Sequence, residues 1–171
     1  MPAKGRRLGI RATIEPTGAL ARALTAGERA LAASMFGAAI DYDRVRIRRR
    51  CWWPLQPRRI VMAPDGDIWF HPQGPHWRPD FAAADLGAQG LFIHEMTHVW
   101  QAQRGGRWYL PLMRHPFCRY GYRFAPGRPL ARYGLEQQAE IVRHAFLMRR
   151  GAMPAETTLA AYEAVLPFRS A

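Results

Sequence analysis

The chain has 171 residues and a mass of 19.5 kDa, which suits one domain with a single core. Hydrophobic residues at 49% and charged residues at 22% are typical of a globular protein and exclude long disorder, collagen and a coiled coil. Its apolar runs are far shorter than the roughly 18 to 20 residues that span a bilayer, and no signal-peptide hydrophobic region follows the N-terminal basic residues. The two cysteines exclude a disulfide framework. We therefore expect a cytoplasmic protein without a transmembrane segment, unless a dedicated secretion system delivers it.

The charge balance is strongly basic, with 25 lysines and arginines against 13 acidic residues and a net charge of +12. Such a field can attract nucleic acid, an anionic membrane or an acidic cell-wall polymer. The alternative is compositional, because every basic residue except Lys4 is an arginine and the arginines are spread along the chain, as in proteins from GC-rich genomes. The compositional interpretation is favoured.

One basic stretch calls for a separate assessment. Residues 44–50, followed by Trp52 and Trp53, mix arginine with aromatic side chains as nucleic-acid binders do. An alternating arginine face on an edge strand also prevents aggregation between sheets, and no nucleic-acid fold motif accompanies this one. A nucleic-acid partner is therefore not favoured.

The N-terminal part predicts an arm and then a helix. Residues 1–24 mix Gly, Pro and Arg without a sustained period, which indicates a flexible basic arm. Thr25 and Glu28 have the spacing of a capping box, which opens a helix that continues to about Phe36.

The next segments predict a small antiparallel sheet. Residues 44–48 alternate arginine with apolar side chains, which indicates a half-buried strand. Residues 60–62 and 68–70 flank the turn sequence PDGD at 64–67 and together predict a hairpin.

The second half predicts long helices. Apolar residues at helical spacing indicate one helix over residues 85–103 and another from 135 to 151, and residues 154–166 indicate a short terminal helix. The proline- and aromatic-rich stretch between the two long helices is expected to wrap over the core. We expect a single α+β domain over residues 25–171, in which the sheet packs on the first long helix and the second long helix crosses beneath it.

The strongest chemical signal is the sequence HEMTH, an HExxH motif inside the first long helix. Residues four apart project from one helical face, so His94 and His98 can bind one metal ion from consecutive turns. Glu95 lies beside them and can take a proton from a metal-bound water, which is the general-base role in metal-assisted hydrolysis. The composition of the chain predicts only about 0.008 chance matches to this motif.

A catalytic site of this type needs a third protein ligand. The metzincin class is excluded, because Gln101 and Arg104 stand where its Gly and its third His belong. The next carboxylates along the chain are Glu136 and Glu140, which face one way on the second long helix and would repel each other without a cation opposite them. His115 and His144 remain alternative ligands.

The segment EQQAE at 136–140 resembles the E-x-x-A-D helix of gluzincin-type zinc peptidases. The resemblance implies that Glu136 is the third zinc ligand and that Glu140, which stands where the family has Asp, braces a ligand histidine. Most of the chain after residue 25 is also similar to small bacterial proteins labelled Vgr-related or Rhs-associated, through residues 36–45, 52–53, 62–72, 94–103 and 132–142. This second resemblance implies an HExxH domain linked to secretion-system or polymorphic-toxin loci, with a partner from such a system.

Transition-state stabilisation needs a donor near the developing oxyanion. Tyr133 and His144 are the two candidates closest in sequence to the second long helix, and Tyr120 and His71 are further alternatives.

These features predict a zinc-dependent metallopeptidase with Glu95 as general base, acting on a peptide or protein substrate. We expect the edge strand near residues 68–70 to hold an extended peptide by strand addition. The alternatives are a non-catalytic zinc-containing adaptor or immunity-type protein of a secretion or toxin system, and a basic nucleic-acid-associated protein.

Overall fold

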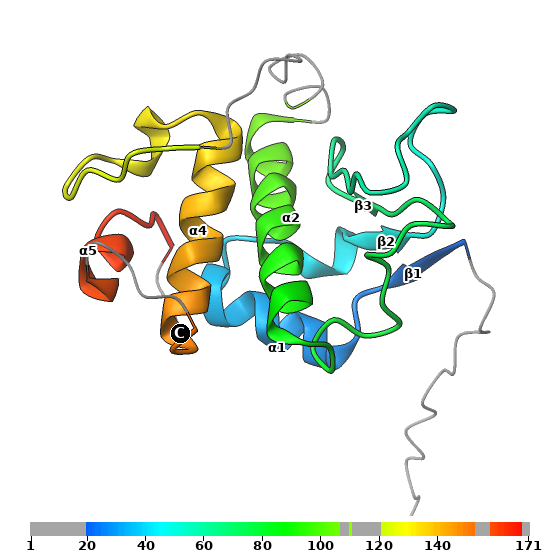
Figure 1. The fold of residues 1–171 in the computed structure, drawn as a ribbon, viewed down its shortest axis with the longest axis horizontal. Helices are drawn as coiled ribbons and strands as arrows, with labels where there is room; N and C mark the ends of the chain where they lie inside the picture. The colour runs from blue at the N-terminus through cyan, green and yellow to red at the C-terminus, as the bar shows by residue number, and fades with distance from the viewer. Residues whose placement is uncertain (1–19, 107–109, 111–120, 153–157, 169–171) are drawn as a thin grey trace, which may run out of the picture.

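The computed structural model describes residues 20–106, 110, 121–152 and 158–168 (Figure 1). Its strands are β1 (Ala21–Ala23), β2 (Arg46–Arg48) and β3 (Ile68–Trp69), and its helices are α1 (Ala26–Phe36), α2 (Leu86–Gly105), α4 (Leu135–Arg149) and α5 (Leu159–Glu163). The expected α+β class is confirmed. None of the helices in these ranges is long and apolar enough to cross a membrane.

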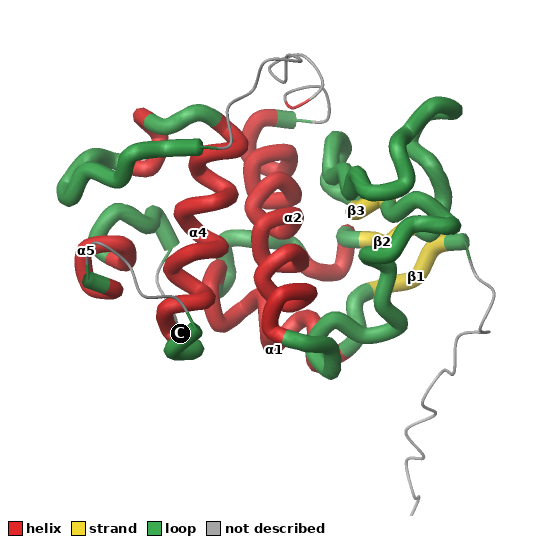
Figure 2. Tube along the Cα trace, in the orientation of Figure 1, coloured by secondary structure: helices red, strands yellow, loops and turns green. Residues whose placement is uncertain are grey.

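Helices α2 and α4 lie side by side in the middle of the molecule (Figure 1). Figure 2 shows the three short strands together with long loops on one side of this pair. A close approach is built into the interface: a Cβ on Gly90 would lie 3.3 Å from Leu147 Cδ2 and 3.4 Å from Arg143 Nε. A larger residue at position 90 would require these two side chains to shift by a few tenths of an ångström, so the glycine permits close contact between the helices here.

The core forms where the apolar faces of the helices meet the sheet. Phe92, Met96 and Val99 of α2 are fully buried, as their helical spacing predicts. Phe81 stacks between Phe70 and Phe92, with ring centroids 5.2 and 5.4 Å away, and so joins the sheet to α2. The predicted helix over residues 85–103 is confirmed in type and extends to Gly105, with the Asp85 side chain capping its first turn.

The predicted capping box at the start of α1 is confirmed. Thr25 Oγ1 accepts a hydrogen bond from Glu28 N at 3.0 Å, and Glu28 Oε2 accepts one from Thr25 N at 2.9 Å. The fully buried Glu28 carboxylate also accepts from Arg22 at 2.7 Å and from Phe81 N at 3.0 Å. One side chain therefore joins β1, α1 and the loop before α2.

The sheet differs from the expectation in two respects. It is mixed, with β1 antiparallel to β2 and β2 parallel to β3. Strand β1 also uses Ala21–Ala23, which belong to the predicted flexible arm; residues 1–19 of that arm lie outside the described residues. The free edge of β2 recruits these residues because an unpaired strand edge leaves peptide groups without partners.

The predicted hairpin over residues 60–70 is reduced to one antiparallel bridge, between Met62 and Trp69. The turn between them is attached to β2 instead, because Asp67 accepts hydrogen bonds from Arg46 N at 2.9 Å and from Arg48 Nε at 2.6 Å. Once the turn is held there, β3 pairs in parallel with β2, and only Met62 remains on its outer edge.

Candidate metal centre

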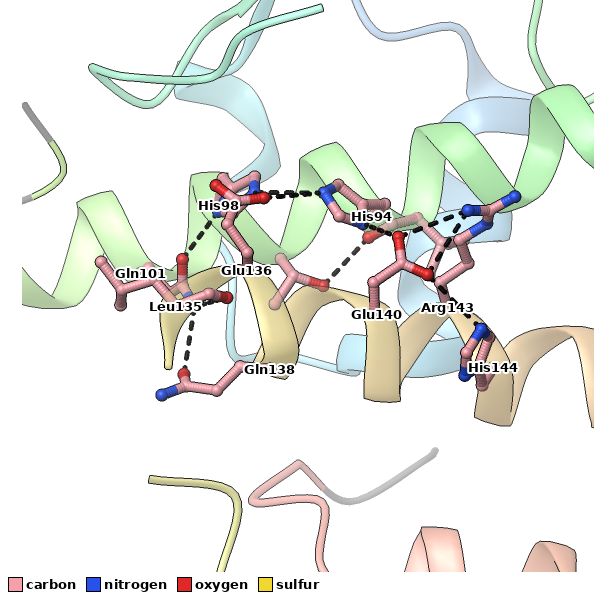
Figure 3. A network of polar contacts seen from close by, with 11 residues as sticks. His94, His98, Gln101, Leu135, Glu136, Gln138, Glu140, Arg143 and His144 are labelled. Carbon is pink, nitrogen blue, oxygen red and sulfur yellow. Dashed lines mark hydrogen bonds and ion pairs between the residues drawn. The ribbon is translucent and has the colours of Figure 1, made fainter. Parts of the chain in front are cut away.

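Three side chains that can bind one metal ion meet between α2 and α4. His94 and His98 project from consecutive turns of α2 toward Glu136 on α4 (Figure 3). The two Nε2 atoms lie 3.3 Å apart, and Glu136 Oε2 lies 3.5 Å from that of His94 and 3.3 Å from that of His98. All three residues are at least 95% buried. Two imidazoles and one carboxylate are a ligand set that suits a divalent transition metal.

The His98 ring is held in the tautomer that a metal ligand needs. Gln101 donates its amide N–H groups to Leu135 O at 3.2 Å and to Gln138 Oε1 at 3.0 Å. The Gln101 oxygen must therefore face His98, where it accepts from Nδ1–H at 2.8 Å. With the proton on Nδ1, the Nε2 lone pair points to the centre of the site.

The His94 ring is held in the same way by α4. Its Nδ1 lies 2.9 Å from Glu140 Oε1, so this nitrogen donates and Nε2 faces His98 and Glu136. Glu140 in turn lies 3.3 Å from Arg143 and 3.4 Å from His144 (Figure 3). Glu140 therefore contacts a candidate ligand histidine, and the bracing role that the gluzincin resemblance implies for it stays a prediction.

The electrostatic balance of the site favours a cation. Burial lowers the pKa of His94, but the hydrogen bonds to Glu136 and Glu140 and the charge of Glu95 outweigh that effect and raise it to about 9. Burial acts to raise the pKa of Glu140, and its contact with His94 more than compensates and lowers it. The carboxylates thus provide more negative charge than the neutral imidazoles can balance.

Glu95 is a buried carboxylate that lines the same cleft as His94. It is 3% exposed, and its Oε2 is buried without a hydrogen-bond partner in the described part of the chain. With His94, Glu140 and Arg143 it lines one side of a cleft of about 240 Å³. The opposite side consists of Arg59, Ile60 and Val61, with His76 and Leu91 completing the lining. A buried carboxylate oxygen without a donor is ready to accept a proton from a bound water.

The edge that can receive an extended peptide is not the predicted one. Trp69 N donates to Met62 O at 2.7 Å and Met62 N to Trp69 O at 3.2 Å, so the edge at residues 68–70 is already covered. Peptide groups alternate in direction along an extended chain, so those of Val61 point away from Trp69. Val61 has no backbone hydrogen bond among the described residues, and it lines the cleft.

The polar atoms of the two predicted donors are engaged elsewhere. The buried Tyr133 hydroxyl bonds to the backbone of Ala125, accepting from N at 2.9 Å. His144 contacts Glu140 through Nε2 and accepts from Tyr122 through Nδ1, and Tyr122 bonds to Tyr162 at 2.9 Å. Burial and the Arg143 charge lower the pKa of His144 despite Glu140, which matches a neutral ring.

Their oxyanion roles stay predictions, while their contacts favour structural support. Among the alternatives, His71 Nδ1 accepts from Gln73 N at 3.1 Å, and the positions of His115 and Tyr120 lie outside the described residues.

Sequence reasoning missed the roles of two residues. Gln101 departs from the metzincin pattern, and its position three residues after His98 on the same helical face is the signal for its contact with that ring. Arg143 follows Glu140 by one helical turn, which is the signal for its contact with that carboxylate.

Together, the fold and the site define a small α+β domain with a buried His-His-Glu cluster beside a cleft. No family model matches the chain. The chain is 43% identical over 140 residues to the type VI secretion system spike protein VgrG2b of Pseudomonas aeruginosa. The match covers 77% of this chain and 13% of that protein. The solved effector domain of P. aeruginosa VgrG2b matches with 42% identity and a TM-score of 0.66, over 75% of each chain. The chain belongs to the family of this effector domain.

Proposed function

We propose that this chain is a zinc-dependent metallopeptidase domain with Glu95 as its general base. The observation that carries the proposal is the triangle of ligand atoms, whose sides measure 3.3, 3.3 and 3.5 Å. Zinc bonds of about 2.0 to 2.1 Å place tetrahedral ligand atoms about 3.3 to 3.4 Å apart, so the triangle fits one face of a zinc tetrahedron. Calcium needs more ligands, all oxygen, at longer distances.

The residues around the triangle support hydrolysis. When bound, zinc supplies Lewis acidity that polarises a scissile carbonyl and lowers the pKa of a water molecule. Glu95 Oε2 accepts the proton from that water and returns it to the leaving amine. The peptide lies along Val61, whose outward peptide groups pair with it and hold the scissile bond over the site. His94 and His98 stay oriented because Glu140 and Gln101 hold their Nδ1 atoms.

The relatives support a place in secretion. VgrG2b is named as a type VI secretion system spike protein and its matching domain as an effector domain. We propose that this chain is likewise delivered by a type VI secretion system, with a spike component as its partner and a protein of the recipient cell as its substrate. Because the chain spans 13% of VgrG2b, the properties of the whole spike are not assumed for it.

The first test is metal stoichiometry, measured by mass spectrometry on protein purified without a metal-affinity tag. We expect about one zinc per chain, from the single ligand triangle. A parent protein that takes up no zinc after reconstitution contradicts the proposal. If the protein binds zinc but hydrolyses neither denatured proteins nor the peptides of a library, the chain is assigned to the alternative of a non-catalytic adaptor or immunity-type protein.

The second test is Glu95→Gln, which keeps the size of the side chain and removes the proton acceptor. We expect full zinc occupancy and a loss of hydrolysis of about 100- to 10,000-fold, the usual contribution of a general base. Glu163→Gln is the matched control, because Glu163 is 40% exposed and pairs with Arg149 away from the site. Hydrolysis retained in Glu95→Gln would exclude Glu95 as the base.

A further inference from the structure

The loop between β2 and the cleft, residues 49–60, exposes large apolar side chains. Among the described residues, four large hydrophobic side chains are exposed, and three are in this loop: Trp53 at 43%, Leu55 at 78% and Ile60 at 44%. The fourth is Leu20. Figure 1 shows the chain after β2 extending away from the α2–α4 pair. An apolar cluster on a projecting loop marks an interaction surface more often than a packing defect.

Arginines flank this apolar cluster on both sides. Arg49, Arg50, Arg58 and Arg59 are exposed, and none of them has an acidic partner among the residues described. No Asp or Glu occurs between residues 44 and 64. By contrast, Arg29, Arg48 and Arg149 each pair with a carboxylate. Within the described part of the chain, no acidic side chain therefore neutralises the charge of the loop.

We propose that the 49–60 loop docks this protein on the surface of an anionic phospholipid bilayer. Each component of the loop matches one layer of such a surface. Trp53 suits the boundary between headgroups and acyl chains, and Leu55 and Ile60 are aliphatic side chains that can enter the acyl region. The flanking arginines contact the anionic headgroups. Nucleic acid fits less well, because it binds through base stacking on aromatic side chains, and the most exposed side chain here is aliphatic.

Docking would orient the cleft toward the membrane surface. Arg59 and Ile60 belong to the loop and also line the cleft that contains Glu95. The loop would thus bring the cleft to proteins held at the bilayer. The binding itself does not depend on metal or on peptidase activity, so it can stand or fail separately from the proposed function.

The experiment is co-sedimentation of the full chain with vesicles of phosphatidylglycerol and phosphatidylcholine in equal amounts, compared with pure phosphatidylcholine vesicles. We expect binding to the anionic vesicles alone, weakened by added salt. Trp53→Ser/Leu55→Ser should weaken it by about ten-fold or more, because those side chains lose their insertion into the acyl region. Leu159→Ser, a half-buried leucine of α5 on the other side of the α2–α4 pair from the strands (Figure 1), is the control and should change binding by less than about two-fold.

The charge is tested with Arg50→Gln/Arg58→Gln, which avoids the residues that line the cleft. We expect each of these two arginines to contribute about five-fold to the affinity for anionic vesicles. The control is Arg123→Gln/Arg132→Gln, which changes the net charge by the same amount at exposed positions outside the loop and should lower the affinity much less. Thermal melting checks that every variant is folded. The proposal is overturned if anionic vesicles do not bind the parent protein or if the controls lose binding equally. It is also overturned if short duplex DNA binds as tightly as the vesicles and Trp53→Ser/Leu55→Ser has no effect, which would assign the loop to nucleic acid.

Discussion

The two sides of the cleft differ in secondary structure and in the burial of their side chains. The side formed by α2 and α4 contains the buried side chains of His94 and Glu95, at 5% and 3% exposure, together with Glu140 and Arg143 of α4. The opposite side consists of an irregular loop, in which Arg59 and Ile60 are exposed. A metal centre requires atoms fixed to a few tenths of an ångström, which rigid packed elements provide. Recognition tolerates adjustment and commonly uses loops on a rigid scaffold.

The two sides also differ in how their structure is stabilised. The two helices are 20 and 15 residues long and pack along each other, whereas the strands that support the loop are only two or three residues long. Strands this short are marginal by themselves. Side chains compensate, with Glu28 joining β1 to α1 and Asp67 joining β2 to the turn before β3. The predictions below separate these two modes of construction.

The largest effect is expected from Glu136→Ala on the helix side. Loss of a residue that only orients a ligand typically lowers metal affinity by about 10- to 100-fold. Removing one of the three ligands themselves should lower zinc affinity by far more and abolish hydrolysis. Inductively coupled plasma mass spectrometry measures the retained metal, with Glu163→Ala as control. Full occupancy in Glu136→Ala would show that a residue other than Glu136 is the third ligand.

On the strand side, Glu28→Ala should cause the largest loss of stability. It leaves Arg22, whose side chain is 16% exposed, without its partner and removes the acceptor for two backbone N–H groups. Breaking a buried ion pair in this way costs about 3 to 5 kcal/mol in free energy of unfolding. Urea denaturation of the metal-free protein measures it. A change below about 1 kcal/mol, typical of a surface ion pair, would mean that the strand side does not rely on this carboxylate.

An intermediate effect is expected from Glu140→Gln, which keeps a side-chain oxygen near His94 but removes its charge. Zinc affinity should fall by about 10- to 100-fold while one zinc per chain still binds at saturation. Glu140→Asp, the residue of the gluzincin pattern, should retain more affinity than Glu140→Gln because it keeps the charge. A larger loss in Glu140→Asp than in Glu140→Gln would show that side-chain length, and not charge, matters at this position.

The smallest effect, counted per pH unit, is a pH dependence of the metal-free protein. The pKa of His94 is about 9 in the fold and 6.5 as the ordinary value, so its protonated form stabilises the metal-free protein. This contribution is complete below about pH 6.5 and is lost as the pH rises through about 9. Zinc must displace that proton, so its affinity should increase by up to about ten-fold per pH unit over the same window. Calorimetric zinc titrations measure this slope, and a flat profile would contradict a protonated His94.

Local features of the sequence were sufficient to predict the helices. The capping box of Thr25 and Glu28 and the spacing of Phe92, Met96 and Val99 act within one or two turns, so they can be recognised without knowing the fold. The HExxH spacing is local in the same sense, which is why His94 and His98 could be placed on one face before the structure was known.

The pairing of the strands could not be predicted in the same way. The PDGD turn is compatible with a hairpin, but Asp67 bonds to β2, some twenty residues away in the chain. Partner choice between strands depends on such distant contacts, and short strands carry little pattern of their own.

The sequence by itself determined the α+β class, the helices and the chemical identity of the candidate ligands, because helix periodicity and residue type are local properties. Only the tertiary structure decided that Glu136 meets the two histidines, that Glu140 and Gln101 orient them, and that the 49–60 loop forms the other side of the cleft. Glu136 and Glu140 lie about forty positions from the two histidines along the chain. Packing of α2 against α4, and not any local pattern, sets the distances between them.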